Sequence, residues 1–339
     1  MGASLRDVAL RAGVSVKTVS NVVNGYEHVT PTTRSKVEAA LKELNYRPNL
    51  SARNLRRGKS GIIALALPEL DSPYFAELAR SVIRAAEERG YTVLIDQTDG
   101  RLERERHVLA GIRPQLVDGL IVSPLSVGRE ELAARTDNTP MVLLGETVFE
   151  GPADHVAIDN VAAAGIATEH LVALGRRRIA AIGVQPPDGQ GTARLRLQGY
   201  LDALSTAGLP VDEDLIQQGA TFHRADGIQA VKDLLSLPEP PDAVFCFNDL
   251  LALGAIRGAY EIGARVPDDI AIVGIDDIED GRFSTPTLTT ISPDKEQIAR
   301  LSLEFLQSRI DGDRDAPPRE VQADFRLMER ESTGGRTAE

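Results

Sequence analysis

The chain has 339 residues, of which 42% are hydrophobic and 4% aromatic, enough to bury cores in two or three domains. Its formal net charge is −12, and its one cysteine, Cys246, excludes an internal disulfide. The longest apolar runs, such as Ile62–Leu67, are too short to span a bilayer, and Arg6, Asp7 and Arg11 interrupt any apolar signal segment. We therefore expect a cytoplasmic protein rather than a membrane or secreted one.

The charge is unevenly distributed along the chain. Residues 1–60 contain eleven Lys or Arg against four Asp or Glu, a net charge of +7, whereas the remainder carries −19. A small basic segment on an acidic body is typical of a nucleic-acid-binding module attached to another domain. A solvated basic surface without a partner gives the same count, so charge alone leaves both interpretations open.

The basic segment begins with two predicted short helices. Ser4, paired with Asp7, and Ser15 are suitable N-caps, and Gly13 supplies the tight turn between the helices. The apolar residues that should pack between them are Leu5, Val8, Ala9, Val19, Val22 and Val23. The residues left on the outer face of the second helix are Val16, Lys17, Ser20 and Asn21. This arrangement predicts a helix-turn-helix, whose second helix enters the major groove of DNA.

A third helix and a short arginine-rich helix follow. Thr30 or Thr32 caps the third helix, and its buried stripe consists of Val37, Ala40, Leu41 and Leu44. Pro48 ends it, and residues 49–57 form the short helix. The Gly-Lys-Ser at 58–60 lacks the glycine five positions earlier that a phosphate-binding loop requires, so we interpret it as a linker.

From Gly61 onward, apolar strand-like runs alternate with amphipathic helices, and the alternation starts again after residue 159. Continuous apolar strands separated by helices predict parallel sheets covered on both faces, so we expect an α/β fold with two lobes of doubly wound parallel sheet. No G-x-G-x-x-G follows a strand, and no His or Cys pair has the spacing of metal ligands. We therefore expect neither a cofactor nor a metal.

Ligands of open α/β sheets bind beyond the carboxyl ends of the strands. The polar residues that follow predicted strands are Asp71, Asn248, Asp249, Asp276 and Asp277, and Arg196 lies near the start of a helix after another strand. Three of the few aromatic residues, Tyr74, Phe75 and Phe222, lie in the same regions. Carboxylate, amide and guanidinium groups beside aromatic faces suit a polyol, through paired hydrogen bonds to hydroxyls and stacking on the ring.

Motifs along the whole chain match one protein family. The head carries "LRDVALRAGVSVKTVSNVVN", "TRSKVEAALKELNYRPN" and "SARNLRRGKS", and the body carries "SPYFAEL", "DGLIVSP", "ARLRLQGY", "FNDLLALGA" and "VPDDIAIVGIDD". With these motifs the chain resembles the lactose-repressor (LacI/GalR) family of transcription regulators. The resemblance implies a body like that of periplasmic binding proteins and a hinge helix, Asn49–Arg57, that pairs with its twin in a homodimer. Leu55 of that helix would enter the minor groove and kink a pseudo-palindromic operator, or alternatively pack against the body.

The resemblance also implies site residues. The implied DNA contacts are Ser4, Val16, Lys17, Ser20, Asn21, Asn24, His28, Thr33, Ala52, Leu55 and Arg56, although His28 is nearly as well explained as a surface turn residue. The effector contacts that the resemblance implies are Tyr74, Phe75, Arg196, Phe222, Asn248 and Asp276. Asp71 is added from its position after a strand, and Glu146 from its place beside Gly145. A helix cap for Asp276, a turn for Asn248 and core packing for the aromatic residues are the structural alternatives. Many sugar-binding relatives have an acidic residue after the strand that ends here at Gly145, so Glu146 is its predicted substitute.

These inferences give a domain plan with a helix-turn-helix domain at 1–48 and a hinge helix and linker at 49–60. The first lobe comprises 61–161 and 292–322, the second lobe comprises 162–291 and 323–330, and the polar tail at 331–339 is expected to be disordered. The tail has no leucine heptad, so a dimer rather than a tetramer is expected.

Two other function classes fit the sequence less well. Five scattered histidines and one cysteine give no catalytic constellation, so the chain is not expected to be an enzyme. A solute-binding transport component would share the fold of the body, but it would have a signal segment and no basic head. The sequence therefore predicts a cytoplasmic, dimeric DNA-binding repressor of carbohydrate-utilisation genes, controlled by a small sugar-like effector. The same architecture sensing a purine or another non-sugar metabolite is the alternative, and induction and co-repression both stay open.

Overall fold

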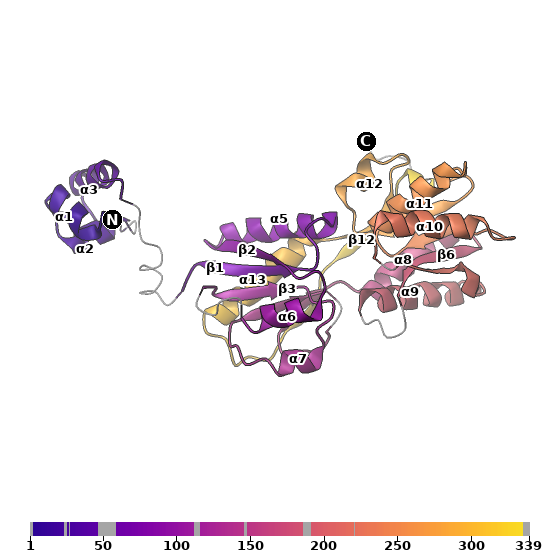
Figure 1. The fold of residues 1–339 in the computed structure, drawn as a ribbon, viewed down its shortest axis with the longest axis horizontal. Helices are drawn as coiled ribbons and strands as arrows, with labels where there is room; N and C mark the ends of the chain where they lie inside the picture. The colour runs from indigo at the N-terminus through magenta and orange to yellow at the C-terminus, as the bar shows by residue number, and fades with distance from the viewer. Residues whose placement is uncertain are drawn as a thin grey trace. The chain divides into compact units, whose positions relative to one another are not determined.

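The computed structural model describes residues 3–23, 26, 28–46, 59–111, 116–145, 148–185, 191–219 and 221–334. The chain divides into two compact units, Met1–Ser60 and Gly61–Glu339 (Figure 1). Each unit has its own hydrophobic core. Within the described ranges, no helix is both long and apolar enough to cross a membrane.

Three helices form the described part of the first unit: α1 (Leu5–Ala12), α2 (Val16–Val23) and α3 (Pro31–Glu43). Its buried core consists of Val8, Ala9, Val19, Val22, Val37 and Ala40. These residues come from the apolar stripes of all three helices, so the predicted packing of the helix-turn-helix is confirmed.

The predicted N-caps of α1 and α2, and the predicted glycine in the turn between them, are present. Ser4 Oγ accepts the Asp7 N–H at 3.3 Å, and an Asp7 carboxylate oxygen accepts the Ser4 N–H at 2.8 Å. Ser15 Oγ accepts the Thr18 N–H at 3.1 Å and so caps α2. Gly13 has a φ of 66°, the left-handed conformation that glycine adopts without steric cost.

The second unit contains two six-stranded sheets, one in each lobe. The first lobe has the strand order β11-β5-β4-β3-β1-β2, with every neighbouring pair parallel. Its strands are β1 (Ile62–Leu67), β2 (Thr92–Gln97), β3 (Gly119–Val122), β4 (Met141–Leu144), β5 (Asp154–Ala157) and β11 (Glu320–Gln322). The second lobe has the order β12-β10-β9-β8-β6-β7, and only the β10–β12 pair is antiparallel. Its strands are β6 (Ile179–Val184), β7 (Ile216–Gln218), β8 (Ala243–Cys246), β9 (Ala271–Ile275), β10 (Thr289–Pro293) and β12 (Phe325–Met328).

Helices cover the faces of both sheets. Those of the first lobe are α5 (Pro73–Glu87), α6 (Leu102–Leu109), α7 (Arg129–Ala133) and α13 (Lys295–Ile310), and those of the second are α8 (Asn160–Ala173), α9 (Thr192–Thr206), α10 (Arg224–Leu235), α11 (Asp249–Glu261) and α12 (Glu279–Phe283). Alternate residues of β1 face different cores: Ile63 packs with α5 and α13, whereas Ala64 packs with α6. Helices α10 and α11 pack so closely that a Cβ on Gly254 would lie 2.1 Å from the Arg224 carbonyl oxygen. The predicted pair of doubly wound lobes is thus confirmed.

The chain crosses between the lobes three times, after β5, after β10 and after β11. As a result α13, which comes late in the sequence, lies in the first lobe beside α5 (Figure 1). A triple crossing of this kind lets two lobes bend about a shared hinge.

The C-terminal segment differs from the prediction of disorder. Residues Glu331–Thr333 form a short 3-10 helix (η2) in which Ser332 and Thr333 are buried. Ser332 Oγ donates to the Ile272 carbonyl at 2.6 Å and accepts the Thr289 N–H at 2.8 Å. Polar composition suggested disorder, but these side chains satisfy backbone groups of β9 and β10, so the prediction is wrong for 331–334. Residues 335–339 lie outside the described part of the chain.

Candidate functional site

The face of α2 predicted to contact DNA is accessible in the first unit. Val16 is 41% exposed, Lys17 is exposed, and Ser20 and Asn21 are half-buried. These four residues lie along one helix that begins at the Ser15 cap. The structure therefore presents the predicted side chains together, and their contacts with bases remain predictions.

The other predicted DNA contacts fall into two groups. Ser4 and Thr33 both take part in helix caps, and the exposed His28 ring lies edge-to-face 5.4 Å from that of Tyr26. Asn24, Ala52, Leu55 and Arg56 lie outside the described residues.

Two arginine side chains of the first unit form an ion pair or a hydrogen bond with other residues of the same unit. A count of charges could not predict these contacts. Arg11 forms an ion pair with Glu43 at 2.6 Å and so joins α1 to α3. Arg34 donates a 2.9 Å hydrogen bond to the Tyr26 carbonyl. Both arginines therefore make contacts within the first unit in addition to contributing positive charge.

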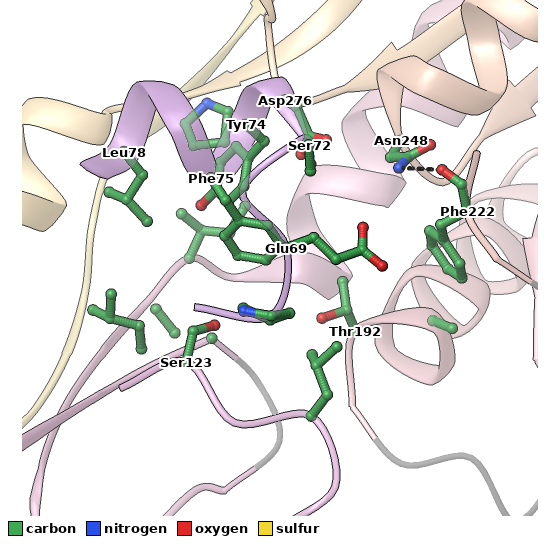
Figure 2. Close-up of a pocket in the computed structure, with 18 of the residues that line it drawn as sticks. Glu69, Ser72, Tyr74, Phe75, Leu78, Ser123, Thr192, Phe222, Asn248 and Asp276 are labelled. Atoms are coloured by element: carbon green, nitrogen blue, oxygen red, sulfur yellow. Dashed lines mark hydrogen bonds between the residues drawn. The ribbon is translucent and has the colours of Figure 1, made fainter. Parts of the chain in front are cut away.

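A cavity of about 450 Å³ lies between the two lobes of the second unit, at the carboxyl ends of both sheets (Figure 2). Its wall includes Pro68 after β1, Ser123 after β3, Gly145 after β4, Gln185 after β6 and Asp276 after β9. Six predicted effector residues line it: Tyr74, Phe75, Arg196, Phe222, Asn248 and Asp276. The topology thus places the cavity where ligands of open α/β sheets bind.

Arg196 contributes a buried guanidinium group from α9. Its Nε donates to Asn160 Oδ1 at 2.7 Å, and its Nη1 donates to the Phe247 carbonyl oxygen. The side chain is only 7% exposed yet lines the cavity, and Nη2 has no hydrogen-bond partner among the described residues. Two protein bonds therefore fix the guanidinium and leave Nη2 available to a ligand.

Asn248 supports the neighbouring wall. Its Oδ1 accepts the Leu251 N–H at 2.9 Å and caps α11, and its Nδ2 donates to the Phe222 carbonyl at 3.0 Å (Figure 2). Phe222 itself has a φ of 60°, which is rare for a bulky residue. Asn248 therefore has a structural role in the cavity wall, but as the cap of α11 and not as the turn residue given as its alternative.

A group of buried carboxylates lies at the end of β9. Asp276 lines the cavity with a φ of 127°, and Asp249 behind it is fully buried. Burial, together with the charge of Asp276, raises the pKa of Asp249 well above its usual range. Burial opposes the ionisation of Asp277, but hydrogen bonds from Arg330 and Arg282 hold the pKa of Asp277 below its usual range. The negative charge is therefore partly balanced before any ligand enters. Within the described ranges, no His, Cys, Asp and Glu cluster could hold a metal ion.

The first-lobe wall is mainly apolar. Tyr74 and Phe75 lie edge-to-face with ring centroids 5.3 Å apart. The aliphatic residues beside them are Leu78, Leu125, Leu144, Val156, Ile158 and Ile298, and the polar groups of this wall include Glu69, Ser72 and Ser123. Sequence reasoning missed these aliphatic and hydroxyl residues, because leucine and serine after a strand carry no distinctive signal.

Two predicted effector residues do not take their expected places. Asp71 is exposed and does not line the cavity, because the chain turns into α5 at the next residue and Ser72 faces the cavity instead. The structure therefore does not bring Asp71 together with the other predicted effector residues. Glu146 lies outside the described residues, next to Gly145, which has a φ of 80°.

Two family models match this chain, one within each of its two compact units. Residues 4–49 match the model of bacterial regulatory proteins of the lacI family. Residues 168–333 match the model of the periplasmic binding protein-like domain.

Individual relatives match over nearly the whole chain. The ribose operon repressor of Escherichia coli (strain K12) is 36% identical over 310 residues, covering 91% of this chain and 93% of the repressor. The HTH-type transcriptional repressor PurR of Proteus mirabilis (strain HI4320) is 38% identical over 336 residues, covering 97% and 96%. The lac repressor dimer bound to operator and the anti-inducer ONPF superposes with a TM-score of 0.85 at 30% identity, covering 98% of this chain and 99% of the repressor. The chain therefore belongs to the lacI family of bacterial regulatory proteins and is a DNA-binding transcriptional regulator.

Proposed function

We propose that this chain represses carbohydrate-utilisation genes in the bacterial cytoplasm, and that a sugar-like effector bound between the lobes of the second unit controls the repression. No chemical reaction is part of this role. The similarity to a ribose operon repressor supports the carbohydrate assignment. The rest of the support comes from the cavity.

The observation that carries the proposal is the unequal chemistry of the two cavity walls. The second-lobe wall presents the Arg196 guanidinium and the Asp276 carboxylate within one cavity, beside the Thr192 hydroxyl. The first-lobe wall presents Tyr74 and Phe75 with the aliphatic side chains around them. Vicinal hydroxyls of a sugar suit the polar wall, and the C–H face of its ring or an apolar substituent suits the opposite wall.

A planar base such as a purine is the second candidate. Three aromatic side chains, Tyr74, Phe75 and Phe222, line the cavity, and aromatic faces stack on planar rings. The ribose operon repressor and the repressor PurR are 36% and 38% identical to this chain, so overall sequence identity does not separate the two candidates.

On DNA, we expect a homodimer in which each α2 enters the major groove of one half of a pseudo-palindromic operator. Lys17 can donate to guanine edges, and Asn21 can pair with adenine. The seven surplus positive charges of residues 1–60 should make operator affinity fall steeply with salt, because bound counterions are released from the phosphates.

A thermal-shift screen of sugars, sugar phosphates and purines with the purified full-length protein tests the effector assignment. Stabilisation by sugars and not by purines supports the proposal, whereas stabilisation by purines alone favours the second candidate. A chain of residues 61–339 should keep effector binding and lose operator binding in fluorescence anisotropy. Operator binding by that shortened chain would contradict the assignment of DNA recognition to the first unit.

A further inference from the structure

The conformation of Phe222 requires an explanation. Its side chain lines the effector cavity, and its φ of 60° lies in the left-handed region, where a bulky L-residue is strained. Such a residue persists only where its surroundings impose the conformation, and strain of this kind concentrates at ligand-binding sites. The groups that hold the backbone on either side of Phe222 therefore determine where its ring lies in the cavity.

The carboxylate of Asp226 holds the backbone before and around Phe222. Asp226 Oδ2 accepts the Thr221 N–H at 2.7 Å and the Thr221 hydroxyl at 2.8 Å. Partial burial opposes its ionisation, but these bonds and the N–H groups of Phe222 and His223 keep the pKa of Asp226 below its usual value. The carboxylate thus takes two hydrogen bonds from Thr221, and the Phe222 ring projects from the next residue.

Asn248 holds the other side of the same residue. Its Nδ2 donates to the Phe222 carbonyl at 3.0 Å (Figure 2), while its Oδ1 is fixed at the N-terminus of α11. Asn248 lines the cavity, so its substitution would alter ligand contacts as well as backbone support. Asp226 is not part of the cavity wall, which makes its influence on a ligand indirect.

The segment that Asp226 holds also touches the opposite lobe. His223 Nε2 lies 3.3 Å from an oxygen of Glu69, which belongs to the first-lobe wall. The segment 221–223 is therefore placed both by α10, through Asp226, and by the first lobe, through Glu69. A shift in its backbone would move the Phe222 ring relative to both walls.

From these contacts we infer that Asp226 is a positioning residue for effector recognition: from outside the cavity, its carboxylate fixes the strained backbone of residues 221–223 and so sets the Phe222 ring as a binding surface. The inference rests on the proposed function, because it concerns the same cavity. It adds a residue that neither touches the effector nor lies at the end of a strand.

The first test needs no effector and uses the full-length protein. Hydrogen exchange of the amides at 221–223 should become at least about tenfold faster in Asp226→Ala, because their acceptor is removed. Asp226→Asn retains one carbonyl acceptor and should give an intermediate rate. Asp233→Ala is the matched control, since Asp233 lies on the same helix and its carboxylate accepts a hydrogen bond from Gln229 at 2.9 Å, away from residues 221–223. Unchanged exchange at 221–223 in Asp226→Ala would overturn the inference whatever the effector proves to be.

The second test is a double-substitution cycle with three named probes: D-ribose, cellobiose and adenine. With each probe that binds the wild type, Asp226→Ala should weaken binding about tenfold, as expected when a strained backbone is released. In a Phe222→Ala background the same substitution should change affinity less than about twofold, because no ring remains to be positioned. Equal losses in both backgrounds would show that Asp226 acts elsewhere. Failure of all three probes to bind the wild type would count against the proposed effector class, and the exchange measurement would still decide the role of Asp226.

Discussion

Replacing Arg196 with alanine tests the effector site most directly. The substitution removes the donors of two buried bonds, to Asn160 Oδ1 and to the Phe247 carbonyl. Asn160 and Phe247 are both buried. An unsatisfied buried acceptor costs about 1–3 kcal/mol and two are left here, so we expect a loss of at least about 2 kcal/mol. In a unit of this size that loss lowers Tm by about 4–8 °C.

The functional loss should be larger than the loss of stability suggests. A hydrogen bond from the free Nη2 to an effector hydroxyl is charge-assisted, and its removal costs about 1.5–3 kcal/mol, equivalent to about tenfold to a hundredfold in affinity. Operator affinity without effector should stay near the wild-type value, because Arg196 lies in the second unit.

Fluorescence anisotropy on the operator, with and without the effector found by screening, measures both quantities. Arg194→Ala is the matched control, because Arg194 is exposed on the same helix and does not line the cavity. A normal effector response in Arg196→Ala would refute the reasoning and place the effector site elsewhere. An equal loss of effector response in Arg194→Ala would show that the effect comes from a general disturbance of helix α9.

Three further outcomes are expected. Burial opposes the ionisation of Asp154, but hydrogen bonds from two arginines lower its pKa from 3.8 to about 2. Its ionised form therefore adds about 2 kcal/mol of stability above pH 3.8 that is lost as pH falls towards 2. In urea unfolding, the difference in free energy of unfolding between the wild type and Asp154→Asn should shrink over that pH range. A difference that stays constant with pH would contradict the assignment. Gly254→Ala should cost about 1–3 kcal/mol, because the new Cβ would lie 2.1 Å from the Arg224 carbonyl, whereas Gly165→Ala, with 3.9 Å to its nearest contact, should be tolerated in the same thermal melt. Lys17→Ala should relax base preference at particular operator positions, by about 1–3 kcal/mol for each lost contact, and an unchanged preference in binding-site selection would refute its role.

The fold was predictable from the sequence because its signals are local and repeated. Ser4 and Ser15 cap helices through their own side chains, and Gly13 is required by a left-handed turn. The alternation of apolar strands and helices after Gly61 determines two parallel sheets, since such strands need cover on both faces. The tail at 331–334 escaped prediction because its order comes from backbone groups of β9 and β10 that lie about 40–60 positions earlier in the chain.

The cavity was predictable only on its polar side. Arg196, Asn248 and Asp276 follow strands, and the topological rule for open sheets places them together. Ser72, and not the neighbouring Asp71, lines the cavity, because the direction of a side chain at a strand-to-helix turn depends on backbone angles that composition does not determine. Leu78 and Leu125 look like ordinary core residues in sequence, and only the packed structure shows that they face a cavity.

The three crossings between the lobes also constrain how the chain can be made. The core of the first lobe includes Ile298 and Leu303 of α13, and β11 forms one edge of its sheet. A nascent chain that has reached only β10 therefore still exposes Ile63 and Leu65 on the face that α13 covers in the finished protein. The first lobe begins to be synthesised before the second but cannot close its core until after most of the second has left the ribosome. Loss of residues after 294 should consequently damage the earliest-made lobe, and unassembled chains should expose an apolar sheet face that chaperones bind.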